Sequence, residues 1–163
     1  MTTMTANLYA SGNCPHGSPY RSRPTNTQRI SIILEKKMSF NVGHTTFGFT
    51  MRVPETEAAT VDDLLAAHAA WMQETHSTIE EEGKLHTLEY YVSKASELND
   101  MMDPSKGTTG HVVYTVNEVH RDDEHFGKHV ELGQSWSRIN EFFGLFEKYS
   151  PLVTMAGRVT AKL

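Results

Sequence analysis

Apolar and polar side chains alternate along the segment TTFGFTMRV, residues 45 to 53. Every odd position from 47 to 53 is apolar, while Thr, Gly and Arg occupy the even positions between them. A period of two residues is typical of a β-strand with one buried face. Pro54 follows directly, and proline cannot donate to a sheet ladder. The pattern therefore predicts a strand that ends at residue 53.

The apolar period becomes helical over residues 60–83. The apolar side chains that fall largely on one helical stripe are Val61, Leu64, Leu65, Trp71, Met72 and Ile79. Thr60 and Asp63 have the spacing of a capping box at a helix start. Gly83 supplies the left-handed residue that commonly ends a helix. We therefore predict one helix across this segment.

Three later segments predict further strands, because they are rich in β-branched and aromatic side chains: residues 85–92, 111–120 and 152–161. The first two are separated by a long polar stretch, residues 93–110, in which we expect at most a short helical turn around residues 96–101.

A second helix is predicted between the last two strands. Asp122 or Asp123 is its N-cap, since a carboxylate satisfies free backbone N–H groups at a helix start. Ser150 and Pro151 end it after Tyr149. Gly133 near its middle costs about 1 kcal/mol relative to alanine, so we expect a kink or a break there.

The predicted order is β-α-β-β-α-β, which indicates a ferredoxin-like α+β domain. In that arrangement a four-stranded antiparallel sheet carries both helices on one face. The other face is expected to be apolar too, because residues 111–120 and 152–161 are apolar at both parities. A second apolar face needs a cover. We therefore predict a homodimer that pairs two sheets face to face.

Composition and charge restrict the partners. The chain has 163 residues, one cysteine (Cys14) and a formal net charge of −5. One cysteine excludes an internal disulfide framework and a cysteine-rich zinc site. Residues 38–163 keep 10 of the 15 basic and 19 of the 20 acidic residues, a formal −9. Such a surface repels phosphate backbones, so we expect no nucleic-acid partner. No run of eighteen apolar residues occurs, so no membrane partner is expected either.

Residues 1–37 differ from the rest of the chain. They consist mainly of Ser, Thr, Asn, Pro and Gly, and positions 1–34 contain no acidic residue. We expect a disordered N-terminal extension, because such a segment buries too little apolar area to offset its ordering entropy. It resembles an organelle transit peptide in its arginines and serines; equally, Met38 is a candidate start that would make it an artefact. The sequence leaves a cytoplasmic and an organellar location open.

The segment HRDDEHFGKHVELGQSW, residues 120–136, holds the densest candidate chemistry. His125 and His129 lie four residues apart, which places both imidazoles on one face of a helix. One interpretation is a metal site in which His120, or alternatively Glu124, joins His125 and His129 and the fourth position stays open, although the sequence has no HExxH motif and no second histidine pair. A second makes His129 a base that moves a proton. The third is a half-exposed histidine hydrogen-bonded to Glu118.

Two polar residues, Asn117 and Glu118, interrupt an otherwise apolar strand. If both sheet faces are covered, at least one of them is buried and must be hydrogen-bonded. Glu118 is then a candidate to orient His129 or to act as a base with a raised pKa. The alternative is that the strand frays there and both side chains reach water.

Three tyrosines and two helix residues complete the candidate site. Tyr90 and Tyr91 are adjacent on a strand, so one of them should reach the interior and donate to an anion; packing alone is the commoner role of a strand tyrosine. We expect a pocket between the second helix and the sheet, beside His129. The candidates to line it are Tyr114, Trp71 and His68.

With these residues in view, the chain resembles the dimeric α+β barrel superfamily, and most of all its antibiotic-biosynthesis-monooxygenase-like domains. The resemblance covers residues 44–163 and rests on the element order and on the segment 116–133. Members commonly follow a strand that bears an acidic residue with an acidic turn and a helix with a Phe three residues before a His. Glu118, Phe126 and His129 hold those positions here.

The resemblance implies an α+β barrel homodimer that binds a small hydrophobic molecule. Haem chemistry is disfavoured, because the Asn of strand one and the Trp of strand three that the haem-degrading branch uses are missing. No phosphate loop or nucleophile elbow is present either. We therefore expect an oxidoreductase without cofactor or metal: a cofactor-independent monooxygenase or proton-transfer enzyme on a phenolic, quinol or polyketide-like substrate.

The assignment places catalysis at His129, Glu118, Tyr90 and Tyr91, and ligand binding at Phe126, Asn117, His68, Tyr114 and Trp71. Two alternatives stay open. One is a non-catalytic protein of the same fold that binds a hydrophobic ligand or is associated with stress. The other is a metal protein that uses His120, His125 and His129.

Overall fold

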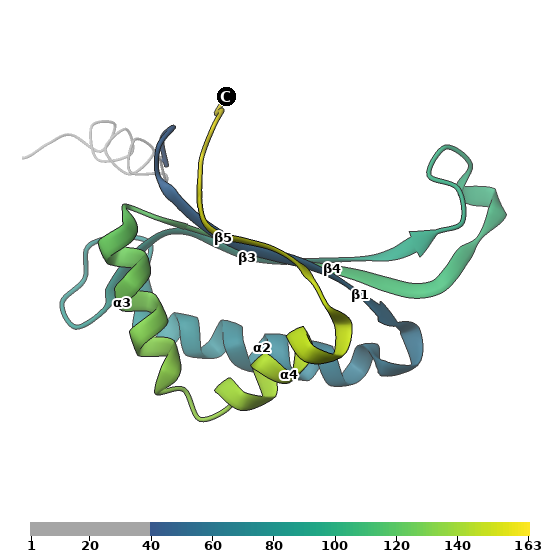
Figure 1. Cartoon of the computed structure of the whole chain (residues 1–163), viewed down its shortest axis with the longest axis horizontal. Coiled ribbons are helices and arrows are strands. Elements are labelled where there is room, and N and C mark those ends of the chain that lie inside the picture. Colours follow the sequence, from purple (N-terminus) through teal and green to yellow (C-terminus); the bar gives the residue numbers. More distant parts are fainter. Residues whose placement is uncertain (1–39) are drawn as a thin grey trace, which may run out of the picture. The chain divides into compact units, whose positions relative to one another are not determined.

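A five-stranded sheet is the centre of the part of the chain that the computed structural model describes, residues 40–163. Three α-helices cover one of its faces (Figure 1). The elements are β1 (Thr45–Pro54), η1 (Glu55–Glu57), α2 (Ala58–Thr75), β2 (His76–Ser77), β3 (Leu85–Leu98), η2 (Pro104–Lys106), β4 (Thr108–His120), α3 (Asp123–Gln134), α4 (Ile139–Tyr149) and β5 (Leu152–Arg158). The predicted extension 1–37 lies outside the described residues. No helix within residues 40–163 is both long and apolar enough to cross a membrane.

The strands follow the order β2-β3-β4-β1-β5. The four longer strands pair antiparallel, with Phe49 of β1 opposite Val116 of β4 and opposite Val153 of β5. The two-residue strand β2 joins β3 in parallel, because it follows α2 directly and runs back along the sheet edge. The sheet is therefore mixed.

The α+β class is confirmed, but the predicted fold is wrong in its details. Instead of a four-stranded antiparallel sheet with two helices, the chain forms a five-stranded mixed sheet with three helices. The extra helix arises because the predicted second helix breaks after Gln134, one residue beyond Gly133, and restarts at Ile139. Asp122 caps α3 as expected, since its side chain accepts a hydrogen bond from the backbone N–H of His125.

The first helix is shorter than predicted and begins earlier. It starts at Ala58, so the capping box expected from Thr60 and Asp63 does not form, and the N-cap residue Glu57 makes no side-chain cap. It ends at Thr75 rather than at Gly83, which lies in a later turn with a φ of 81°. Ile79, expected on the apolar stripe, is exposed.

The hairpin β3–β4 is longer than the sequence indicates. The polar residues 93–98 continue β3, and the expected helical turn at 96–101 is absent; a single 3-10 turn occurs instead at Pro104–Lys106. Asp103 caps that turn by accepting a hydrogen bond from the Ser105 N–H. The two arms pair with each other, so their backbone groups are satisfied without a helix.

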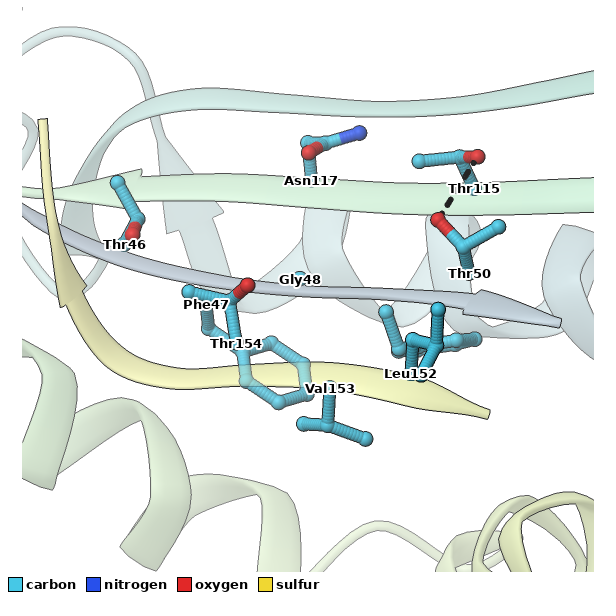
Figure 2. A pocket seen from close by; sticks show the side chains of 10 residues that line it. Thr46, Phe47, Gly48, Thr50, Thr115, Asn117, Leu152, Val153 and Thr154 are labelled. Carbon is cyan, nitrogen blue, oxygen red and sulfur yellow. Dashed lines mark hydrogen bonds between the residues drawn. The ribbon is translucent and has the colours of Figure 1, made fainter. Parts of the chain in front are cut away.

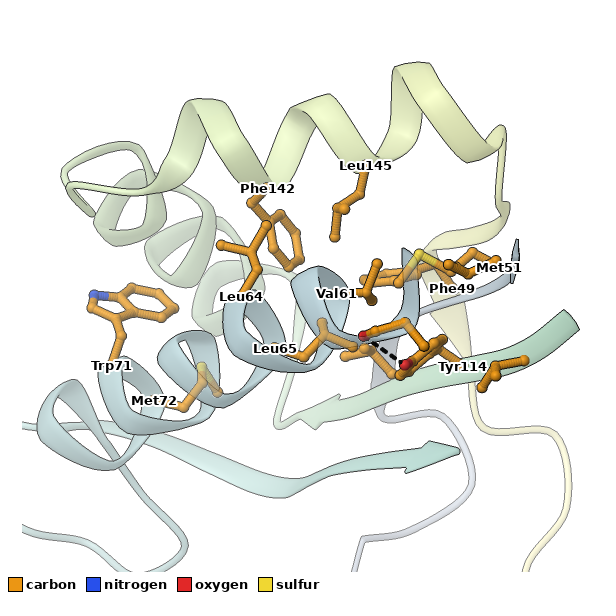
Figure 3. Close-up of a cluster of buried hydrophobic side chains, with 14 of the residues drawn as sticks. Phe49, Met51, Val61, Leu64, Leu65, Trp71, Met72, Tyr114, Phe142 and Leu145 are labelled. Carbon is orange, nitrogen blue, oxygen red and sulfur yellow. Dashed lines mark hydrogen bonds between the residues drawn. The ribbon is translucent and has the colours of Figure 1, made fainter. Parts of the chain in front are cut away.

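The hydrophobic core lies between the sheet and the helices (Figure 3). Val61, Leu64 and Leu65 of α2 project toward the sheet and toward α4. Phe49 contacts Phe142 of α4 edge-on, at 5.7 Å between ring centroids. Tyr114 is also part of this core, and its hydroxyl donates to the Ala58 carbonyl and to Asp62. These contacts fix α2 and α4 on one face of the sheet.

The opposite face of the sheet carries polar and apolar side chains together, because Val113, Val119 and Tyr91 share it with threonines. The odd positions of β1 face the helices, and Thr46, Gly48 and Thr50 remain for the other side. Thr115 and Asn117 lie beside them on β4, and Thr50 and Thr115 join through their hydroxyls (Figure 2). A shallow hollow of about 290 Å³ lies here. The homodimer through this face stays a prediction.

Candidate functional site

A buried carboxylate and two histidines come together where the end of β4 meets α3. Glu118 and His120 lie two residues apart, so both point to the helix side of the sheet. His129 reaches them from the second turn of α3. Their exposed fractions are 1%, 0% and 7%. One carboxylate oxygen, Glu118 Oε2, lies 3.0 Å from His120 Nε2 and 3.3 Å from His129 Nε2.

A chain of hydrogen bonds continues from His129 to the end of α2. His129 Nδ1 lies 3.1 Å from His76 Nε2, and His76 Nδ1 lies 2.7 Å from Thr75 Oγ1. The same hydroxyl lies 2.7 Å from the carbonyl oxygen of Trp71. The residues come together because α2 ends at Thr75 and the chain turns at once into β2, which carries His76 inward.

Burial keeps these imidazoles neutral. It lowers the pKa of His76, His120 and His129 to about 4, and neighbouring imidazoles oppose a positive charge on each of them as well. For His129 the negative charge of Glu118 acts in the opposite direction but does not outweigh burial. Burial also raises the pKa of the Glu118 carboxyl to about 7. A carboxyl held among neutral rings lacks a full countercharge.

The neutral state fixes the direction of the hydrogen-bond chain. A carbonyl oxygen only accepts, so the single hydroxyl hydrogen of Thr75 goes to Trp71. His76 Nδ1 must then donate to Thr75, which leaves His76 Nε2 as an acceptor. His129 Nδ1 donates to it. His129 Nε2 therefore carries a lone pair, 3.3 Å from an oxygen of Glu118.

A second polar pair lies beside this cluster. His68 of α2 is buried, and its Nδ1 lies 3.0 Å from the hydroxyl of Tyr90 on β3. Burial lowers the pKa of His68 to about 3, with further contributions from His129 and His76, and burial raises the pKa of Tyr90 above its usual value. Either group can donate in this hydrogen bond, because a neutral imidazole and a neutral phenol each carry one hydrogen and the direction depends on the imidazole tautomer.

An aromatic pocket of about 230 Å³ lies on the other side of His129. Most of its lining is apolar: Phe47, Trp71, Phe126, Val130, Trp136, Ile139, Phe142, Phe143 and Met155. Among the residues that line it, His129 alone has a titratable side chain. A second hollow of about 220 Å³ is lined by His76, Thr87 and Tyr90. The histidine chain thus runs from one cavity toward the other.

The structure brings together seven of the residues singled out from the sequence. Glu118, His120 and His129 form the cluster, Tyr90 and His68 lie beside it, and Trp71 and Phe126 line the aromatic pocket with His129. His68 packs against the Trp71 ring at 5.4 Å between centroids. Glu118 meets water at neither oxygen, because the strand does not fray.

Four predicted site residues lie elsewhere. Tyr91 and Asn117 face the open side of the sheet, as the strand alternation requires, and Tyr91 is 49% exposed. Tyr114 lies farther along β4, where its hydroxyl is used by Ala58 and Asp62. His125 bonds to its own N-cap residue, Asp122, so it does not join His120 and His129 as the predicted metal set required. Glu118 takes the third place in that set.

His76 is the residue that the sequence did not reveal. The sequence predicts a helix over residues 60–83, and a lone histidine inside a helix carries no signal. The β-branched neighbours Thr75 and Thr78 lower helix propensity and indicate an earlier helix end. The two-residue strand that turns His76 inward depends on β3, and no local pattern predicts it.

No protein-family model, curated protein or solved structure matches this chain. The similarity to the dimeric α+β barrel superfamily therefore stays a prediction from the sequence, and the functional argument depends on the geometry of the site.

Proposed function

We propose that the protein is an enzyme that takes a proton from a small apolar molecule, such as a phenol or quinol, bound in the aromatic pocket. One observation carries this proposal: His129 lies in the wall of an aromatic pocket and is backed by a buried carboxylate and a directed hydrogen-bond chain. Ligand sites are characteristically apolar cavities with a few placed polar groups.

The chemistry follows from the environment of His129. A phenol O–H in the pocket has this imidazole as the nearest base of the lining. Transfer of the proton gives an imidazolium, which the carboxylate of Glu118 stabilises at 3.3 Å. The proton on Nδ1 then passes to His76, whose ring lines the second hollow. The phenolate stays in the aromatic pocket.

A narrower form of the proposal is the cofactor-independent monooxygenase, in which the bound anion itself supplies electrons to O₂. The rest of the proposal does not require it. A phenol that only loses its O–H proton gives no new product, so turnover without O₂ would require a substrate that isomerises after it loses the proton. Oxygen consumption distinguishes this form from the monooxygenase.

A non-catalytic ligand-binding protein is the second candidate, and one observation favours it. Both ring nitrogens of His129 already face protein atoms, Glu118 on one side and His76 on the other. A base must free one nitrogen before it meets a substrate. A binding protein needs only the pocket.

The test uses 1-naphthol and a panel of quinols with the full chain and two variants, His129→Ala and His125→Ala. Trp71 and Trp136 line the pocket, so ligand binding should quench tryptophan fluorescence saturably in all three proteins. Turnover, followed by product formation and oxygen uptake, should fall by roughly 100-fold or more in His129→Ala. His125→Ala removes a nearby histidine outside the pocket and should keep the native rate.

Equal turnover in native protein and His129→Ala would refute the role of that histidine. Binding without any turnover would favour the binding protein. Absence of binding across the panel would contradict both candidates.

A further inference from the structure

Two electron-rich atoms, His129 Nε2 and Glu118 Oε2, face each other inside the cluster. The hydrogen-bond chain through His76 and Thr75 places the His129 hydrogen on Nδ1 and leaves Nε2 with its lone pair. That nitrogen lies 3.3 Å from Glu118 Oε2. Two such atoms repel each other at this distance in a buried site unless something positive lies between them. The candidates are a proton and a metal ion.

His120 supplies a third ligand atom. Its Nε2 lies 3.0 Å from the same carboxylate oxygen, and one ligand atom from each of Glu118, His120 and His129 lies within 4.8 Å of the other two. Ligands at about 2.0–2.2 Å from one ion are about 2.8–3.6 Å from each other in octahedral or tetrahedral geometry. Both contacts to the carboxylate have this length already. The remaining side of the triangle, between the two imidazoles, is no longer than 4.8 Å.

The ligand types also match. Two neutral imidazoles and one carboxylate are the protein ligands of several zinc and non-haem iron(II) centres, in which further positions stay open. A neutral imidazole with a lone pair is the form of histidine that binds metals. A divalent ion would also supply the positive charge that the buried carboxylate lacks.

The surroundings of the three residues support the same occupant. A histidine ligand commonly donates its second ring N–H to an acceptor, which fixes the ring. His129 does so, with His76 as the acceptor. Within residues 40–163, three buried side-chain atoms lack a hydrogen-bond partner: Thr87 Oγ1, Glu118 Oε1 and His120 Nδ1. Thr87 pairs with His120 across the strands, so all three belong to this end of the sheet. Glu118 Oε1 is free to act as a second carboxylate ligand.

We infer that Glu118, His120 and His129 bind one divalent first-row transition ion, of the zinc or iron(II) type, in the interior of the chain. The ion bridges the carboxylate and the two Nε2 atoms, and His76 orients His129 from outside. This inference concerns binding alone and does not rest on the proposed enzymatic function. With the ion bound, both ring nitrogens of His129 are engaged, Nε2 by the ion and Nδ1 by His76, so His129 accepts a proton from a substrate only in the metal-free protein.

The experiment is a titration of the full chain without a histidine tag, freed of metal by a chelator, with cobalt(II) and then zinc(II). Visible absorption of cobalt(II) reports its coordination, and displacement by zinc(II) gives the relative affinity. The native protein and His125→Ala should each bind one ion per chain. Glu118→Gln and His120→Asn should bind at least about 100-fold more weakly, because each loses a ligand.

A measurement on the native protein keeps the test decisive if those variants fail to fold. Zinc(II) should shift the ring ¹⁵N signals of His120 and His129 at one equivalent and leave that of His125 unchanged. No binding at one equivalent, or zinc shifts confined to histidines far from the cluster in sequence, such as the half-buried His44 and His86, would overturn the inference. So would native affinity in a folded Glu118→Gln protein.

The outcome separates the two proposals, because the titration contains no small molecule. If the protein binds and turns over naphthol but binds no metal, only the inferred metal site is refuted. If the protein binds metal but its aromatic pocket binds no ligand, only the proposed enzymatic function is refuted.

Discussion

The buried pair of His68 and Tyr90 makes a prediction about acid sensitivity. Burial lowers the pKa of His68 from 6.5 to about 3, so the folded chain keeps this ring neutral where the unfolded chain protonates it. Above pH 6.5 the difference contributes nothing. As the pH falls from 6.5 toward 3, the unfolded state gains a proton that the folded state cannot take, and the free energy of unfolding decreases.

The magnitude follows from the two pKa values. Between pH 7.5 and pH 5.0, one histidine with these values removes about 2 kcal/mol from the free energy of unfolding. His76, His120 and His129 have lowered pKa values too, so the native chain should lose considerably more over the same range. Replacing His68 by leucine should remove its share, about 2 kcal/mol.

Tyr90→Phe provides the matched control. Both substitutions break the 3.0 Å hydrogen bond between the two side chains, and both therefore lower stability at pH 7.5. Only His68→Leu also removes the titrating group. Urea unfolding at pH 7.5 and pH 5.0 should thus show a smaller pH-dependent loss in His68→Leu and a native-like loss in Tyr90→Phe. Equal losses in all three proteins would refute the reasoning.

Two further predictions concern packing. Gly48→Ala should lower the free energy of unfolding by about 1–3 kcal/mol, because its new Cβ would lie 2.9 Å from the Val116 carbonyl oxygen. Gly127→Ala in α3 meets no atom within 4 Å and should raise it by about 0.5–1 kcal/mol; urea unfolding that gives the two variants the same sign would contradict this account. Phe49→Ala should cost about 3–5 kcal/mol, whereas Phe143→Ala, at a side chain 53% exposed, should cost far less; similar unfolding midpoints for both would show that the core is elsewhere.

Strand periodicity predicted half of the site. The alternation of β4 turns Glu118 toward the helices and Asn117 away from them, and the Asp122 cap sets the turn on which His129 lies. Their meeting was therefore foreseeable from local rules. The position of the His125 ring could not be foreseen in this way. The ring hydrogen-bonds to the N-cap residue Asp122 instead of joining His129 on the same side of the helix.

The rest depends on tertiary structure. Thr60 and Asp63 have the spacing of a capping box, but Pro54 and the 3-10 turn after it start the helix at Ala58. Residues 93–98 carry no strand signal by themselves and become β3 because β4 pairs with them. The sequence predicts an apolar open face because residues 111–120 and 152–161 are apolar at both parities, but Thr46, Thr50 and Thr115 share that face with Val113, Val119 and Tyr91. The length of a strand and the side chains that share its face depend on the strands beside it, which a local sequence pattern does not contain.

Ring ¹⁵N chemical shifts of the histidines, followed from pH 8 to pH 4, test the central claim most directly. The claim is that neutral imidazoles surround Glu118 and that hydrogen bonds fix their tautomers. In metal-free protein, His129 should carry its hydrogen on Nδ1 and leave Nε2 bare, and His76, His120 and His129 should stay neutral down to about pH 5. A His129 with its hydrogen on Nε2, or a titration midpoint near the ordinary histidine value of about 6.5 for these rings, would contradict the account.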